Sequence, residues 1–110
     1  MISYKIGKGS TLSIGKPAIQ SEEMIKDLVA FFKRRDTVNS ATLAWKVQNG
    51  EAGYLLVIDS VEKPQSIMPI IGNICQPHLG NYMLDVLYKD TALGRFVFDE
   101  VDAFYIKKLS

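Results

Sequence analysis

The sequence has few of the side chains that perform chemistry in most enzymes and metal sites. It contains one cysteine and one histidine among 110 residues. No internal disulfide can form, and the soft ligands are too few for a zinc site within one chain. Basic and acidic residues nearly balance, with a formal net charge of +1. The chain therefore lacks the overall field that would attract nucleic acid or an anionic membrane.

Long apolar runs are also missing from the chain. No segment approaches the roughly 18 consecutive apolar residues of a membrane-spanning helix, and the N-terminal stretch MISYKIGKG lacks the apolar run of a signal peptide. We therefore expect a cytoplasmic protein that binds neither membranes nor nucleic acid. The apolar fraction of 47% and the charged fraction of 23% are typical of globular proteins. Together with the length, they predict one domain over residues 1–110.

The stretch KIGKGSTLSIGKP (residues 5–17) has the glycine, lysine and hydroxyl content of a phosphate-binding loop. A P-loop requires Gly-Lys followed by Ser or Thr, but Gly15 and Lys16 precede Pro17. A dinucleotide fingerprint requires a third glycine where Leu12 stands. We interpret the stretch as two short strands joined by a glycine turn, and we expect no nucleotide and no other cofactor.

A well-marked amphipathic helix is predicted after this hairpin. Ser21 can accept a hydrogen bond from a free amide, and Glu22 and Glu23 face the positive end of the helix dipole. The basic cluster KRR at 33–35 is predicted to cap the carbonyl groups at the helix end. Apolar residues recur along one face at Ile25, Leu28, Val29 and Phe32.

The middle of the chain predicts a hairpin of two strands. From Val38 to Val47 apolar and polar side chains alternate, which indicates a strand with one buried face. NGEAG at 49–53 is a turn signal. YLLVID at 54–59 is apolar on both faces and predicts a central strand.

The last third of the chain alternates helix and strand signals. Residues 66–76 return to helical spacing, with Pro69 expected in the first turn. YMLDVLY at 82–88 predicts a strand, followed by a short helix or turn and a final extended aromatic piece. This order of elements predicts an α+β fold: a mostly antiparallel sheet with two main helices on one face, in a single small domain.

Reactive side chains are few, and we expect no catalytic and no metal-binding residues. Cys75 and His78 lie in one segment without an evident acidic partner nearby, so we interpret Cys75 as a buried, inert thiol. Asp59 and Asp85 would form an acid and base pair if their strands were neighbours. We favour the simpler interpretation, in which Asp59 begins a turn and Asp85 faces solvent.

Aromatic residues crowd the C-terminal third of the sequence. Most of them should fill the core of a small domain, while one or two are expected on the surface as a partner-docking patch. The candidate docking residues are Tyr88, Arg95, Phe98, Phe104 and Tyr105.

Several segments, taken in order, resemble the C-terminal domain of the bacterial enhanced serine sensitivity (SseB) family. These segments are GSTLSIGKPA, VNSATLAW, GYLLVID, YMLDVLYKD and DAFYIKK, between Gly9 and Lys108. The resemblance implies an α+β fold and a bacterial cytoplasmic setting, and it transfers no catalytic residues. Because the family usually carries this domain behind a related N-terminal domain, the chain is either a stand-alone copy or part of a longer protein.

These observations lead to two main hypotheses about function. The first is a non-enzymatic protein-interaction or regulatory module that docks another protein or a second copy of itself, forming a homo-oligomer. The alternative is a domain that binds a small polar metabolite such as an amino acid, with Arg95 as the carboxylate partner. A third hypothesis, an enzyme that uses Asp59 or Asp85, would require a concave pocket with a strongly perturbed carboxylate.

Overall fold

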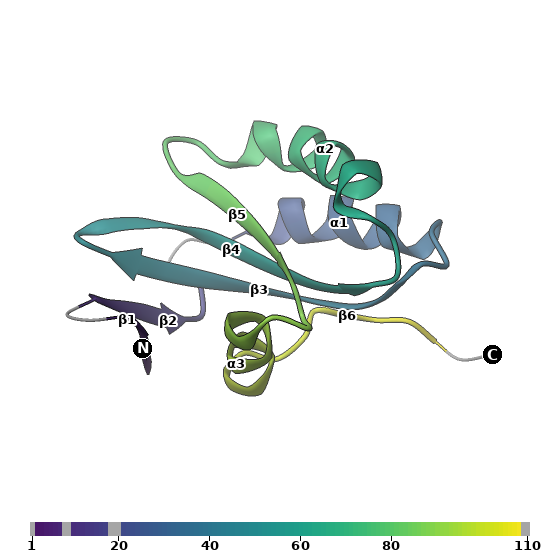
Figure 1. Ribbon diagram of the computed structural model, residues 1–110. Coiled ribbons are helices and arrows are strands. Elements are labelled where there is room, and N and C mark those ends of the chain that lie inside the picture. The colour runs from purple at the N-terminus through teal and green to yellow at the C-terminus, as the bar shows by residue number, and fades with distance from the viewer. Residues whose placement is uncertain (1, 8–9, 18–20, 109–110) are drawn as a thin grey trace.

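A computed structural model describes residues 2–7, 10–17 and 21–108 and shows a mixed sheet with helices on both faces (Figure 1). The strands are β1 (Ile2–Gly7), β2 (Ser10–Gly15), β3 (Val38–Gln48), β4 (Glu51–Ser60), β5 (Met83–Tyr88) and β6 (Tyr105–Ile106). The helices are α1 (Glu22–Lys33), α2 (Pro64–Cys75) and α3 (Ala92–Glu100), with a short 3₁₀ helix, η1 (Gln76–His78), directly after α2.

The sheet has the order β1-β2-β3-β4-β5, and β6 pairs with β3. All paired strands run antiparallel except β4 and β5, which are parallel because α2 and η1 carry the chain back across the sheet. β4 takes one edge of β3, so β2 and β6 share the other edge, at opposite ends of β3. The predicted α+β fold with a mostly antiparallel sheet is confirmed.

The two predicted main helices, α1 and α2, cover the same face of the sheet, as predicted (Figure 1). Between them and the sheet lies the larger of two apolar clusters. The opposite face carries a smaller cluster under α3 and the β1–β2 hairpin, built around Leu12, Ile14, Leu55, Val57 and Val97.

This second cluster makes one prediction about β3 wrong. The strand was expected to have one buried face, but Thr42 and Ala44, on the predicted polar side, are both fully buried. They are covered because α3 and the segment after it cross that face of the sheet. The hydroxyl of Thr42 donates to the carbonyl oxygens of Val101 and Asp102, at 3.0 and 2.9 Å. This contact fixes the segment that follows α3.

Helix α1 begins after Ser21, as predicted, but the Ser21 hydroxyl makes no capping hydrogen bond. Its buried side chains include Leu28 and Phe32 of the predicted stripe together with Met24 and Phe31. The helix is therefore held by its packed face rather than by its N-cap.

In the basic cluster at 33–35, Lys33 lies in the last turn of α1, as predicted, whereas Arg35 lies beyond the helix and has another role. The guanidinium of Arg35 donates through Nε and Nη2 to the carboxylate of Glu62, at 2.6 and 2.8 Å. The hydroxyl of Thr37 donates to the same carboxylate, and the hydroxyl of Tyr88 donates to the main-chain carbonyl of Glu62. These contacts join the ends of α1, β4 and β5.

Helix α2 also differs from its prediction. It begins at Pro64, in the first helical position, so Pro69 lies in the second turn rather than the first. Proline has no N–H, so the carbonyl of Gln65 loses its partner within the helix. Gln65 and Pro69 are both exposed, and water can satisfy that carbonyl.

Candidate docking groove beside strand β5

The structure places the five candidate docking residues in different surroundings. The hydroxyl of the buried Tyr105 donates to the carbonyl of Phe32 at 3.3 Å. Phe104 is half-buried and stacks on the Phe32 ring, with centroids 6.3 Å apart. Tyr88 is half-buried at the end of β5, where its hydroxyl is bonded to Glu62. These aromatic side chains belong mainly to the packed interior.

The remaining two candidates lie on α3. Phe98 is half-buried, and the ammonium of Lys89 sits 4.8 Å from the centre of its ring. Arg95 is exposed, and its guanidinium lies 3.4 Å from the carbonyl oxygen of Asp90. The five candidates therefore do not form one patch.

The two strand aspartates are on neighbouring strands but do not face each other. Asp85 pairs with Leu55 in the β4–β5 register, whereas Asp59 follows Ile58, the partner of Tyr88. They are about 13 Å apart along the strands, at about 3.3 Å per residue. The carboxylate of Asp85 forms an ion pair with Lys46 on β3. The geometry gives no support to an acid and base pair of these aspartates.

Cys75 and His78 have an acidic neighbour that the sequence did not reveal. The Nε2 atom of His78 lies 2.8 Å from the carboxylate of Asp27, which comes from α1. The absence of an acidic partner was therefore a wrong expectation. The Cys75 thiol is fully buried, and this burial, with a smaller effect of Asp27, raises its pKa to about 11. A thiol with this pKa carries almost no thiolate at neutral pH.

The described residues hold no group of three or more His, Cys, Asp or Glu side chains arranged to bind a metal ion. In the same part of the chain, no helix is both long and apolar enough to cross a membrane.

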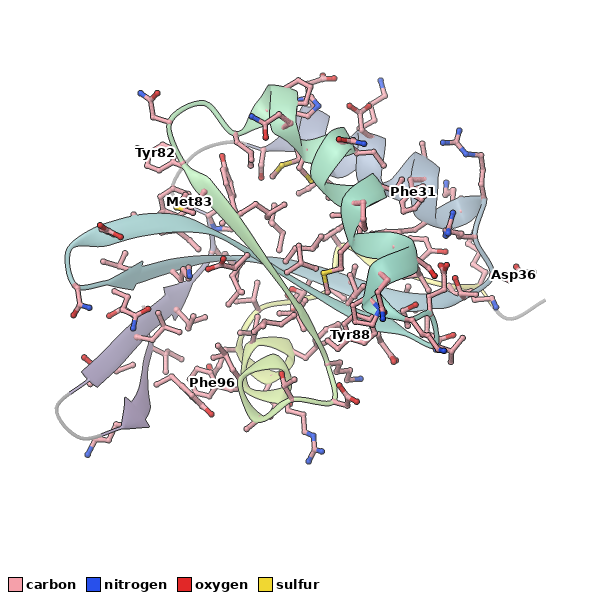
Figure 2. The ribbon with its side chains drawn as sticks, turned by 45° about the horizontal axis from the view of Figure 1, so that its top comes forward. Phe31, Asp36, Tyr82, Met83, Tyr88 and Phe96 are labelled. Carbon is pink, nitrogen blue, oxygen red and sulfur yellow. The ribbon has the colours of Figure 1, made fainter. Side chains whose placement is uncertain are left out.

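A groove of about 540 Å³ runs between α2 and β5, and we call it the β5 groove. One wall comes from α2 and η1, and the other from the loop before β5 and from β5 itself. The first wall includes Met68, Gly72 and Gln76, and the second includes Met83, Leu84, Asp85 and Val86. Tyr82 and Met83 lie at one end of β5 and Tyr88 at the other (Figure 2).

The β5 groove is almost free of charge. No Asp, Glu, Lys or Arg occurs between Lys63 and Asp85, a stretch that contains all of α2 and η1. The exposed face of α2 is instead made of uncharged residues such as Gln65, Gly72 and Asn73. Depletion of charge is a property of the centres of protein interfaces. The sequence contains this signal, but the position of the stretch beside a strand edge depends on the tertiary structure.

Strand β5 is the outermost strand of the sheet on this side. Lys89 donates its N–H to the carbonyl of Ile58 on β4, at 2.8 Å. The direction of the backbone N–H and carbonyl groups alternates from one residue to the next along a strand. Leu84 and Val86 are an odd number of residues from Lys89, so their backbone groups point away from β4. In the described part of the chain, no backbone hydrogen bond outside the β4–β5 ladder reaches Leu84 or Val86. β5 therefore offers an open edge along the groove.

Large side chains are exposed at the start of this edge. Met83 is 72% exposed, and Tyr82 is 37% exposed although its ring packs edge-on against Trp45. The ring of Tyr54 packs against Trp45 in the same way, so a rigid aromatic group supports this end of the groove. This end of the groove therefore combines exposed apolar and aromatic side chains with an open strand edge.

The fold defines the chain as a small α+β domain with a mixed, mostly antiparallel sheet. A family model described as the SseB protein C-terminal domain matches residues 6–107. The chain belongs to this family. No curated protein and no solved structure matched the chain significantly.

Proposed function

We propose that this domain is a non-enzymatic protein-interaction module that binds an extended segment of a partner protein along β5. The observation that carries the proposal is the open backbone edge at Leu84 and Val86, next to a groove in which Asp85 is the one charged lining residue. An added strand would form main-chain hydrogen bonds with β5, while alternate side chains of the partner enter the groove.

The composition of β5 supports this proposal. Exposed edge strands are usually protected against pairing by lysine, proline or a bulge. The sequence MLDVLY contains none of these residues, and its register with β4 is regular. Its one charge, Asp85, is paired with Lys46 on the face of the sheet. The edge itself therefore remains open to an incoming strand.

The chemistry of the groove indicates what kind of segment would fit. The side chains of Met68, Leu84 and Val86 present apolar surface, and Gln76 adds an uncharged hydrogen-bonding group. Burying a charged side chain here without a partner would be costly. The segment should therefore carry apolar residues at alternate positions.

Site-specific photo-cross-linking tests this proposal. A photo-reactive amino acid at Met83 should cross-link a partner protein in extract of the source cells, and Gly72→Arg, which places a charge in the groove, should abolish the product. The matched control places the same group at Val61, which is 79% exposed and does not line the groove. Cross-linking that survives Gly72→Arg would contradict the proposal. Products formed only between copies of this chain would also contradict it and would indicate a homo-oligomer.

A further inference from the structure

A second groove shares no lining residue with the β5 groove and has a different chemical character. It has a volume of about 550 Å³ and lies between the C-terminal part of α1 and the final segment of the chain. We call it the basic groove, because Lys33, Arg35, Lys107 and Lys108 line it and Asp36 is its one acidic residue.

Three of these cations are available to a ligand. The guanidinium of Arg35 is already engaged by the carboxylate of Glu62. Among the described residues, Lys33, Lys107 and Lys108 form no ion pair, and the ammonium of Lys107 donates only to the main-chain carbonyl of Asp36, at 2.8 Å. The chain as a whole carries a net charge of only +1. The positive charge is therefore a local property of this groove.

Apolar side chains also line the basic groove. Val29 and Phe104 are half-buried, and Ile106 is 71% exposed although it belongs to a strand. An exposed isoleucine among lysines favours a ligand that carries apolar groups as well as negative charge over a simple anion.

The backbone of β6 presents hydrogen-bonding groups on the side away from β3. Lys107 donates its N–H to the carbonyl of Asn39 on β3, at 2.7 Å. Ile106, one residue earlier, therefore directs its N–H and carbonyl away from β3. These groups can pair with an extended chain that lies in the groove.

We propose that the basic groove binds an acidic, extended segment of a partner protein. Carboxylates of the segment face the ammonium groups of Lys33, Lys107 and Lys108, and its alternate apolar side chains pack on Phe104 and Ile106. Charge complementarity selects this occupant, because the lysines attract negative charge and the apolar lining favours a ligand with apolar groups over a free anion. The site is independent of the β5 groove, so either proposal can fail without the other.

The probe is a short fluorescent peptide in which glutamate alternates with valine, and binding is followed by fluorescence anisotropy at low salt. The expected result is saturable binding, with amide NMR shifts confined to residues 29–36 and 104–108. Raising the salt concentration from about 0.05 to about 0.2 M should weaken binding about fivefold or more, because exposed charge pairs are screened. The matched peptide with lysine in place of glutamate should not bind.

Lysine-to-glutamate substitutions test whether the peptide binds in the basic groove. The double variant Lys33→Glu/Lys108→Glu should weaken binding at least about tenfold. The control Lys5→Glu/Lys89→Glu makes the same change in net charge at two exposed lysines outside the groove and should bind like the original protein. Thermal unfolding verifies that both variants fold.

Four results would overturn the proposal. They are no binding at low salt, equal binding of the lysine peptide, equal weakening in the control variant, and NMR shifts centred on β5. Displacement of the peptide by free glutamate at an equal concentration of carboxylate would overturn it as well, because the groove would then bind small anions.

Discussion

The carboxylate of Glu62 lies 2.6 Å from Nε and 2.8 Å from Nη2 of Arg35, so the loop after β4 is joined to the loop after α1. The hydroxyl of Thr37 donates to the same carboxylate. Hydrogen bonds from Arg35 and then from Thr37 lower the pKa of Glu62 from 4.5 to about 2. The ionised form of Glu62 is therefore favoured in the folded protein.

This pKa makes the acid stability of the domain depend on Glu62. A carboxyl group whose pKa is lower in the folded state stabilises the fold above its ordinary pKa, and the contribution disappears as the pH falls toward the folded-state pKa. Between about pH 4.5 and about pH 2, Glu62→Gln should therefore lose stability less steeply than the original protein. Urea unfolding at a series of pH values measures this slope. Glu51→Gln, at an exposed carboxylate, is the matched control, and identical slopes for Glu62→Gln and the original protein would contradict the expectation.

Thr42 is the buried polar residue that holds the segment after α3 against β3. Thr42→Val keeps the shape but removes the donor to the carbonyls of Val101 and Asp102. We expect a loss of about 1–2 kcal/mol in the free energy of unfolding, because two carbonyls lose their shared partner. Hydrogen exchange should also accelerate at the amides of Phe104 and Lys107, which bond to β3. Thr42→Ser retains the hydroxyl and should show a smaller effect; equal exchange in both variants would contradict the role of the hydroxyl.

Alanine substitutions at two helical glycines should change the stability of the protein in opposite directions. A Cβ atom at Gly94 would overlap the carbonyl oxygen of Tyr88, whereas a Cβ at Gly72 would meet nothing within 4 Å. Gly94→Ala should therefore destabilise the protein by about 2–3 kcal/mol through overpacking. Gly72→Ala should stabilise it by about 0.5–1 kcal/mol, because alanine loses less backbone entropy in a helix. Urea unfolding of both variants checks the signs, and a stabilised Gly94→Ala would show that the loop before α3 adapts freely.

Cys75 should be unreactive in the folded protein. Its pKa is raised from 9.0 to about 11, mainly by burial. Because the thiol is buried and protonated, alkylation at neutral pH should require opening of the structure and should accelerate sharply in urea. An alkylation rate for the native protein equal to that of the unfolded chain would contradict the buried location.

The same shift gives Cys75 an effect on stability at alkaline pH. Since the folded-state pKa lies above the ordinary value, the contribution to stability is complete below about pH 9 and decreases as the pH rises toward about 11. In Cys75→Ala, stability should therefore decline less steeply at alkaline pH. An unchanged decline would contradict the expectation and would show that other groups cause it.

Local patterns were sufficient for most of the elements. The hairpin at 49–53, the apolar strand at 54–59 and the stripe of α1 were predicted because their signals depend on near neighbours in the chain. The prediction for Pro69 was wrong because no side-chain cap marks where α2 begins, and the helix starts earlier, at Pro64. The burial of Thr42 was missed because α3, which covers it, is about fifty residues away in sequence.

The candidate sites were harder to predict than the elements. Aromatic content alone did not separate Tyr105, which is buried, from Tyr82, which is exposed at the end of the β5 groove. The uncharged stretch between Lys63 and Asp85 was visible in the sequence, but its position beside an open strand edge was not. The basic groove combines residues from α1 and from the end of the chain, which no local pattern connects.

The sequence by itself determined most of the elements and the α+β class, because backbone preference and apolar periodicity act over a few residues. Only the tertiary structure decided which strand lies at the edge, which aromatic rings are covered and which lysines share a groove. The physical reason is that burial and charge clustering depend on contacts between distant segments. The pairing of β6 with β3, for example, brings Lys107 beside α1 and leaves Ile106 exposed.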